Sequence, residues 1–222
     1  MEHSSAGPLF ASGNPSLLLR PGVAIIGSRA ASLEALRLAR SVAASLCTHG
    51  LVIVSGLATG IDSAAHEGAV SSRGYTIAVI GTGLDRAYPA ENARLQECIY
   101  RDHLLVSPFA AGSQTAPWHF PARNRVIAQL SSAVVLVEAD EKSGTRHVIE
   151  ECARLGRPVF VRSDLLPRLS WLPRAEARTT VTPWNPAGTA NDNHERLSSA
   201  RYAVPFDALA AAIATASTSR AP

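Results

Sequence analysis

The chain has 222 residues, 46% of them hydrophobic and 18% charged, and its formal net charge is +3. Such a chain can bury the core of one large globular domain, and so small a charge permits a nucleic-acid or nucleotide partner without requiring one. No apolar run approaches the length of a membrane span, and residues 1–16 lack the basic and apolar segments of a secretory leader. We therefore expect a cytoplasmic protein.

Six short apolar runs follow one another along the chain, and most end in small or polar residues. Each run is continuous rather than alternating, which is typical of strands buried on both faces of a parallel sheet. The runs predict strands at residues 23–26, 51–54, 76–80, 104–106, 133–137 and 158–161.

Helical patterns fill the intervals between these runs. Ser32 is suited to cap a helix that continues to about residue 48, where His49 and Gly50 would end it. Further helices are predicted at about residues 60–72, 91–100, 121–130 and 145–156. The regular alternation of strand and helix predicts an open, doubly wound, mostly parallel α/β sheet in three layers.

The pattern changes after Arg162. Residues 183–193 are rich in Asn, Pro and Gly and predict a loop, and residues 206–216 predict one short closing helix. We therefore divide the chain into an N-terminal extension (residues 1–20), a Rossmann-like core (residues 21–162) and an irregular, Pro-rich C-terminal extension (residues 163–222).

The basic residues and the cysteines add two constraints. All 21 basic residues except Lys142 are Arg, which suits bidentate phosphate contacts, although genome base composition explains the same bias equally well. Cys47, Cys98 and Cys152 are far apart and show neither a CxxC pair nor a metal-ligand spacing. They predict free thiols, which fit a reducing cytoplasm, and no metal site.

Ligands of open α/β sheets bind at the carboxyl ends of the strands, so the candidate site lies there. The first strand ends in Gly27-Ser28-Arg29 before a helix, whose N-terminal N–H groups favour an anion. Gly27 permits a sharp turn and Arg29 adds a positive charge; an ordinary turn with an exposed Arg is the alternative. A GxGxxG motif is absent, and Ser55-Gly56 stands where a ribose-binding carboxylate would be, which counts against a nicotinamide dehydrogenase.

The second and third strand ends are also rich in Gly and hydroxyl residues. Small residues let a phosphate approach the main chain closely. The candidate contacts are Ser55, Gly56 and Gly60 after the second strand and Gly81, Thr82 and Gly83 after the third. Asp62 and His66 follow on one helix, and we expect a capping or dipole role for Asp62 and a place in the core for His66.

A segment of alternating aromatic and Arg residues opens the fourth predicted helix. It reads Trp118-His119-Phe120-Pro121-Ala122-Arg123-Asn124-Arg125. Single-stranded nucleic acid suits such a pattern, because bases stack on rings while Arg neutralises phosphates. We expect Trp118 and Phe120 in the core and Arg123, Asn124 and Arg125 at the ligand. Lys142, Ser143 and Gly144, after the fifth strand, are further candidates.

No nucleophile–base pair and no metal triad stands out among these motifs. A binding role needs fewer assumptions than a catalytic one. We therefore expect no catalytic residues and no cofactor.

The motifs occur in the order seen in the DNA-processing protein A (DprA/Smf) family. The residues that carry the resemblance are Gly27-Ser28-Arg29, SGLATGID at 55–62, Ala65-His66, GTGLD at 81–85, YPAEN at 88–92, FPARNR at 120–125 and Lys142-Ser143-Gly144. The resemblance covers about residues 10–161. It implies an extended Rossmann-like domain that binds single-stranded DNA, forms a homodimer and, in transformation, loads the RecA recombinase onto incoming strands.

The same resemblance implies roles for single residues. Arg29 would contact a backbone phosphate, and Ser55 and Gly56 would form the floor of an anion pocket. The path of the strand would be lined by Arg123, Arg125 and Lys142. The chain departs from the family pattern after Gly144, where Thr145-Arg146-His147 replaces a Ser/Thr-rich helix start, and its core begins within about twenty residues of Met1. These departures predict a shortened member of the family.

The main alternative is a nucleotide-binding or nucleotide-sensing module of similar fold. The wider superfamily includes nucleoside-monophosphate phosphoribohydrolases with a PGGxGTxxE motif. Gly144-Thr145 is present here, but Pro-Gly-Gly is absent and the first Glu, Glu150, falls five residues after Thr145 instead of three. This spacing argues against the hydrolase and leaves a nucleotide ligand as the alternative to DNA.

Overall fold

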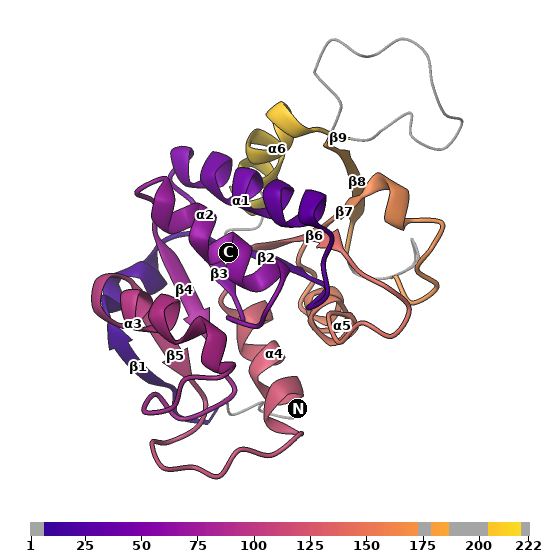
Figure 1. The fold of residues 1–222 in the computed structure, drawn as a ribbon. Helices are drawn as coiled ribbons and strands as arrows, with labels where there is room; N and C mark the ends of the chain where they lie inside the picture. The colour runs from indigo at the N-terminus through magenta and orange to yellow at the C-terminus, as the bar shows by residue number, and fades with distance from the viewer. Residues whose placement is uncertain (1–6, 173–178, 187–203, 219–222) are drawn as a thin grey trace, which may run out of the picture.

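A computed structural model describes residues 7–172, 179–186 and 204–218 of the chain. Its strands are β1 (Phe10–Gly13), β2 (Gly22–Gly27), β3 (Val52–Ser55), β4 (Thr76–Val79), β5 (Leu104–Ser107), β6 (Ala133–Glu138), β7 (Val159–Arg162), β8 (Val181–Asn185) and β9 (Val204–Pro205). They form one sheet in the order β1-β5-β4-β3-β2-β6-β7-β8-β9 (Figure 1). Every described pair is parallel except β1 with β5. The prediction of a doubly wound, mostly parallel sheet is confirmed.

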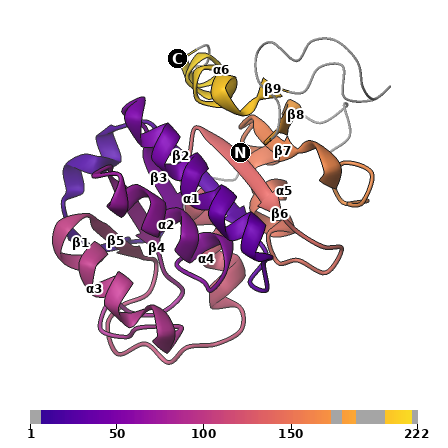
Figure 2. The ribbon, with the colours of Figure 1, turned by 45° about the horizontal axis from the view of Figure 1, so that its top comes forward.

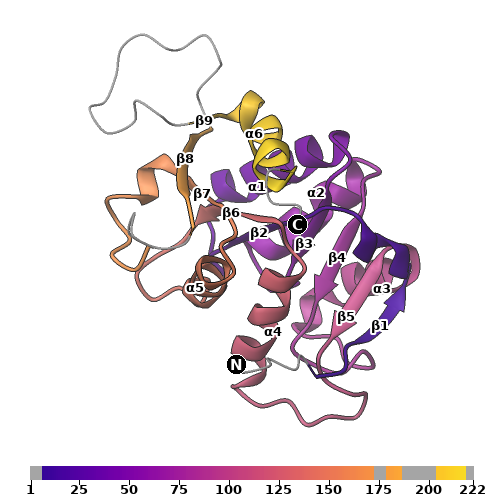
Figure 3. The same cartoon turned by 180° about the vertical axis from the view of Figure 1, so that it is seen from behind.

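Helices cover both faces of this sheet. They are α1 (Leu33–Thr48), α2 (Ile61–Ser71), α3 (Ala93–Asp102), α4 (His119–Gln129), α5 (Arg146–Arg154) and α6 (Phe206–Thr218). The view in Figure 1 has α1, α2 and α3 in front of the sheet, and the view from behind in Figure 3 brings α4 and α5 forward. Figure 2 shows α6 beside α1, on the same face.

The core therefore has two halves, one on each side of the strands. Alternate residues of a strand point to opposite faces. In β2, Val23 and Ile25 pack among the side chains of α1, α2 and α6, whereas Ala24 and Ile26 pack with those of α4 and α5. All four are at most 1% exposed, so the continuous apolar pattern reflects burial on both faces.

The direction of winding reverses at β2. From β2 the chain adds β3, β4 and β5 on one side, through α1, α2 and α3, and it then returns to add β6 and β7 on the other side. Parallel crossovers are right-handed, so a reversal of direction transfers the connecting helices to the opposite face. The gap between the carboxyl ends of β2 and β6 is the switch point at which such folds bind ligands.

The sheet continues beyond Arg162, where the sequence pattern indicated irregular structure. β7 pairs with β8, so Pro183, which we expected in a loop, lies within a strand beside Val161. Trp184 in β8 is fully buried, and its packing with Phe160 explains the extension of the core. The closing helix predicted at residues 206–216 is α6, whereas residues 187–193 of the predicted loop lie outside the described residues.

One cross-link fixes the start of α1 against the end of β6. The hydroxyl of Ser32 accepts a hydrogen bond from the Ala35 amide (3.1 Å) and donates to Glu138 Oε2 (2.8 Å). The Ser32 amide donates to Glu138 Oε1 (2.9 Å). Ser32 is thus the N-cap that the sequence predicts, and the same side chain ties α1 to the strand across the switch point.

We expect Ser32→Ala to lower the free energy of unfolding by about 1–2 kcal/mol, because it removes the cap and one hydrogen bond to a carboxylate. The melting temperature should fall by roughly 3–6 °C in a chain of this size. Ser41→Ala is the matched control, since Ser41 is an exposed residue in the interior of α1, where Ala favours the helix. Equal melting temperatures for the two variants would contradict the role of Ser32.

Candidate functional site

A cavity of about 450 Å³ lies at the switch point. Three segments that follow strands or open helices form its wall. They contribute Gly27, Ser28 and Arg29 after β2, Phe120, Arg123 and Asn124 in α4, and Asp140, Lys142, Ser143, Gly144, Thr145 and His147 between β6 and the first turn of α5. The sheet therefore gathers residues that are up to 120 positions apart in the sequence.

A second, smaller hollow of about 90 Å³ continues this cavity towards β3 and β4. It is lined by Gly56, Tyr88 and Pro89, and it shares Arg29, Phe120 and Arg123 with the larger one. The Tyr88 ring lies 5.5 Å from the Phe120 ring between centroids. The two hollows thus form one depression with basic side chains at the larger end and aromatic rings at the smaller end.

The floor of the depression depends on two glycines. A Cβ on Gly56 would lie 2.7 Å from Asp62 Oδ2 and would overlap the guanidinium of Arg123. Gly60 has a φ of +83°, and a Cβ there would meet the main chain of Ser28 and Arg29. Small residues are needed here because side chains and backbone of the protein itself occupy the space.

Arg123 is a buried cation beneath the depression. Its side chain is 4% exposed, and Nη1 donates to the Val79 carbonyl at 2.9 Å. Burial lowers the pKa of Arg123, and the attraction of the Asp62 carboxylate opposes this shift. Burial also raises the pKa of Asp62, against the attraction of Arg123. The two groups compensate each other, so Arg123 is part of the framework and its charge is partly neutralised.

Arg29 differs from Arg123 because it is exposed at the rim. It forms no salt bridge with any side chain in the part of the chain that the structure describes, and its guanidinium carbon lies 5.7 Å from the centre of the Phe120 ring. Arg29 is therefore a cation with its hydrogen-bond donors open to an anionic ligand.

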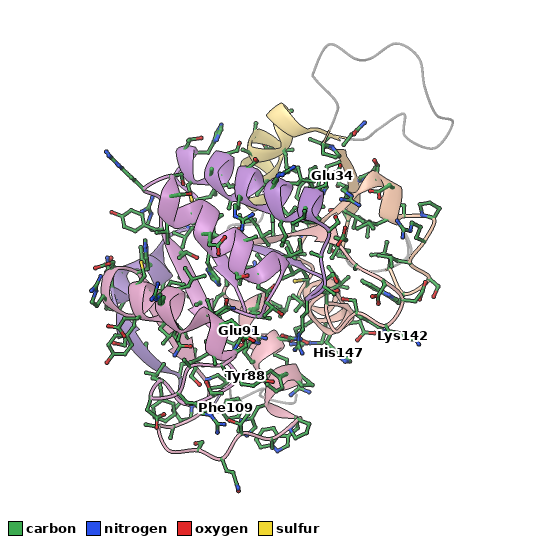
Figure 4. All side chains as sticks on the ribbon, viewed as in Figure 1. Glu34, Tyr88, Glu91, Phe109, Lys142 and His147 are labelled. Atoms are coloured by element: carbon green, nitrogen blue, oxygen red, sulfur yellow. The ribbon has the colours of Figure 1, made fainter. Side chains whose placement is uncertain are left out.

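Lys142 supplies a second cation to the cavity lining, from the segment between β6 and α5. Its amide donates to Asp140 Oδ1 at 2.8 Å, which turns the chain before α5. Ser143 Oγ lies 2.7 Å from Thr145 Oγ1, and Asn124 Nδ2 lies 3.5 Å from the Gly144 carbonyl. Figure 4 shows Lys142 and His147 projecting from this segment at the surface. Arg29 and Lys142 thus line the cavity from two different strand ends.

Most of the residues predicted from sequence come together here. Gly27, Ser28, Arg29, Arg123, Asn124, Lys142, Ser143 and Gly144 line the larger cavity, and Gly56 lines the smaller. The backbone at three strand ends therefore does converge, as the topology requires. Whether these residues bind phosphate stays a prediction.

Six predicted residues line neither hollow. Ser55 is fully buried and its hydroxyl donates to the Ile25 carbonyl at 2.7 Å, so it has no proton left for a ligand. Thr82 is 1% exposed and donates to the Arg86 carbonyl at 2.9 Å. The others are Gly60, which underlies Ser28, Gly81, which packs against the first turn of α4, Gly83, which packs against the loop after β5, and Arg125, which is exposed on α4. The Gly-rich third strand end thus serves packing.

Arg125 points towards a different neighbour. Arg154, and to a smaller extent Arg125, lowers the pKa of Glu151 on α5. Arg125 therefore lies within electrostatic range of Glu151 on α5. The 3.6-residue period of a helix separates Arg123 from Arg125 by about 200°, which explains why only one of them reaches the cavity.

Aromatic residues at the rim were missed or misplaced by the sequence analysis. Tyr88 is 46% exposed, and Trp118, which we expected in the core, is 62% exposed. Phe120 is half-buried and forms wall rather than core. Tyr88 lies three residues after the Gly-rich third strand end, and this position is the signal that would have identified it as a residue of the rim.

His66 occupies the core, as predicted. Thr76 Oγ1 donates its proton to the Ile53 carbonyl (2.8 Å), so it accepts from His66 Nδ1 (2.6 Å). Burial is the main cause that lowers the pKa of His66 to about 3. His66 is therefore a neutral structural residue at physiological pH.

The described residues contain neither a metal-binding cluster nor a membrane-spanning helix. No group of three or more His, Cys, Asp or Glu side chains in them is arranged to hold a metal ion. No helix among them has both the length and the apolar character needed to cross a membrane.

Comparison with known proteins gives consistent matches. The family model of DNA recombination-mediator protein A matches residues 3–179. DNA processing protein DprA of Streptococcus pneumoniae is 49% identical over 152 residues, which are 68% of this chain and 54% of that protein. DprA of Bacillus subtilis is 37% identical over 153 residues, 68% of this chain and 52% of that protein. This chain spans about half the length of these curated relatives.

Two solved structures of such relatives resemble the fold. The match to the Streptococcus pneumoniae structure has a TM-score of 0.66, and it covers 69% of this chain and 54% of the Streptococcus chain. That of DNA processing protein A from Helicobacter pylori, a protein studied for its single-stranded DNA binding mode, is 30% identical with a TM-score of 0.67. It covers 77% of this chain, which in turn covers 82% of the Helicobacter chain.

We expect Gly56→Ala to lower the free energy of unfolding by about 2–3 kcal/mol, because the new Cβ displaces the buried Arg123 from the Val79 carbonyl. Gly144→Ala is the matched control at the same edge, since a Cβ there meets nothing within 4 Å. Urea unfolding of both variants measures the difference. A Gly56→Ala protein as stable as the control would show that Arg123 can relocate at no cost.

We expect His66 to make stability depend on pH. Its pKa of about 3 in the folded chain lies below the ordinary 6.5, so the unfolded chain takes up the proton first as the pH falls. The stabilisation is complete above pH 6.5 and is lost towards pH 3; by pH 4.5 the loss should reach about 2–3 kcal/mol. His66→Asn keeps a donor near Nδ1 and cannot titrate. Urea unfolding at pH 7.5 and 4.5 should show a smaller loss for His66→Asn, and an equal loss would contradict the assignment.

Proposed function

This chain belongs to the family of DNA recombination-mediator protein A, and we propose that it binds single-stranded DNA along the carboxyl edge of its sheet. The observation that carries this proposal is the pair of exposed cations, Arg29 and Lys142, that line one cavity at the switch point. The relative from Helicobacter pylori, which this chain matches over 82% of that chain, is described as binding single-stranded DNA.

The chemistry of the depression supports a polynucleotide ligand. Arg29 presents a planar guanidinium that suits the oxygens of a phosphate, and Lys142 presents a point charge in the same cavity lining. Tyr88 and Phe120 offer rings on which unpaired bases can stack. Bases inside a duplex are not available for such stacking, so the arrangement favours a single strand. The comparisons do not favour the alternative of a free-nucleotide sensor.

We further propose a role in DNA uptake or recombination, with the protein protecting single strands and presenting them to the RecA recombinase. The family name and the DNA-processing names of its relatives support this role. We also propose that the protein acts as a homodimer, as the family resemblance implies, and that residues 21–162 with their C-terminal additions form the DNA-binding unit. Because the chain spans about half of its curated relatives, each of these partners needs a direct test.

The proposed role requires no bond cleavage. Ser55, the hydroxyl at the end of β3, is engaged with a main-chain carbonyl, and His66 is held neutral in the core. All three cysteines are free thiols, Cys152 being buried and the other two partly exposed. Free thiols are typical of a reducing compartment, and we propose that the protein works in the cytoplasm.

We expect Arg29→Ala to weaken binding of a fluorescein-labelled oligothymidylate at every salt concentration. Each phosphate contact releases counterions, so the slope of log K against log salt should become shallower by about 0.7 for a single strand. Fluorescence anisotropy between 50 and 300 mM salt measures both quantities. Lys142→Ala should act in the same way.

Arg101→Ala is the matched control for charge. Arg101 is also exposed, but it lies at the end of α3, which leads into the amino end of β5 on the opposite edge of the sheet. Its loss should leave the salt slope unchanged. Equal slopes for Arg29→Ala and the wild type, or an equal affinity of the wild type for duplex and single strand, would refute the proposed binding mode.

A further inference from the structure

Trp118 is a large apolar side chain that remains mostly open to solvent. It is 62% exposed, whereas Trp184 is fully buried and Trp171 is partly buried. Trp118 immediately precedes α4 at the carboxyl edge of the sheet. An exposed indole offers a broad stacking surface, so its position relative to the proposed DNA path is informative.

The Trp118 ring is held in place by two other rings. Phe109, which follows β5, meets it at 5.5 Å between centroids with an interplanar angle of 77°. His119 meets it at 4.3 Å and 76°. His119 in turn stacks on Phe109 at 3.6 Å and is bonded through Nδ1 to the Gly81 carbonyl (3.1 Å). The platform is therefore anchored to the ends of β4 and β5 and is rigid before any ligand arrives.

This platform and the depression meet at Gly81. Its carbonyl is bonded to His119 of the platform, and a Cβ there would lie 3.1 Å from the ring of Phe120, which lies in the wall of both hollows and near Arg29. Figure 4 labels Phe109 and Tyr88 in the lower part of the view, with His147 and Lys142 farther to the right. The carboxyl edge thus presents cations after β2 and β6 and aromatic rings after β4 and β5.

The charge around the platform suits the same ligand. Residues 103–122 contain no Asp, Glu, Lys or Arg. The nearby Asp85 carboxylate accepts a hydrogen bond from the Gly112 amide at 2.9 Å, which holds it in the turn. A phosphodiester strand that passes over Arg29 next meets a segment that carries aromatic rings and no charged side chain of its own.

We infer that Trp118 is a stacking platform for an unpaired nucleobase of the strand whose phosphates Arg29 binds. This inference rests on the proposed function and adds to it the direction of the strand, from Lys142 past Arg29 towards β5. It separates two kinds of contact: phosphate neutralisation at the switch point and base stacking at the Trp118 platform. A nucleobase is the expected occupant because the ring lies at the end of a path that starts with unpaired cations.

The test titrates the full chain with an oligothymidylate and with an oligomer of the same length made of abasic residues. Trp118→Ala should weaken binding of the oligothymidylate by roughly 5- to 150-fold, the range typical of one stacked base. It should leave the salt slope unchanged, because no phosphate contact is lost. The abasic oligomer should bind wild type and Trp118→Ala equally.

Two controls separate stacking from other effects. Trp118→Phe keeps an aromatic ring and should retain most of the affinity. Tyr75→Ala removes a ring of similar exposure (42%) just before β4, at the opposite edge, and should change nothing. Tryptophan emission should fall on binding in the wild type and not in Trp118→Phe, since the other two Trp residues are partly or fully buried.

The outcomes are decisive in both directions. A wild type that binds no oligomer would remove the proposed function and the platform together. A wild type that binds normally, with Trp118→Ala unchanged or equally weakened for both oligomers, would remove the platform alone. If Trp118→Ala bound as tightly as the wild type but sedimented differently, Trp118 would be assigned to contact between copies of this chain, and the inference would be overturned.

Discussion

The handedness of parallel crossovers determines which edge of the sheet is open to a ligand. Because parallel crossovers are right-handed, the change of direction at β2 transfers the later helices to the opposite face and opens the edge between β2 and β6. Gly27, Lys142 and Phe120 come from distant parts of the sequence, and they meet because the three segments that carry them all lead to this edge.

The two arginines at this edge have different physical roles. Arg123 is buried and bonded to the end of β4, and its attraction is the largest of those that stabilise the charge of Asp62, so removing it would leave that buried carboxylate poorly compensated. Arg29 is exposed and forms no salt bridge in the described part of the chain, and its attraction for Asp62 is the smallest of these. A buried cation balanced by Asp62 shapes the floor, whereas an exposed cation with open donors attracts a ligand. Sequence position alone does not distinguish these two roles.

The fold was predictable because hydrophobic patterns report burial directly. All six predicted strands and five central helices are present, and Ser32 is the cap that its position indicated. The site was predictable only in part. Glycine-rich strand ends look alike, but the hydroxyl of Ser55 satisfies a buried carbonyl and Gly83 admits a neighbouring loop. Trp118 was misplaced because a large apolar side chain is expected in the core by default. Its ring packs edge-on against Phe109 and His119, and these contacts depend on tertiary structure that the local sequence does not show.

The loop that carries Arg29 is fixed before a ligand binds. The Ser28 amide donates to the Glu138 carbonyl at 2.7 Å, and the Ser28 carbonyl accepts from the Ile61 amide at 3.1 Å. Ser32 and Glu138 close the same loop on its other side. The backbone is therefore held by β6, α2 and α1 together, and binding has to order only the Arg29 side chain. Preorganisation of this kind reduces the entropic cost of association, so a shallow, solvent-open depression can hold a flexible polyanion with few direct contacts.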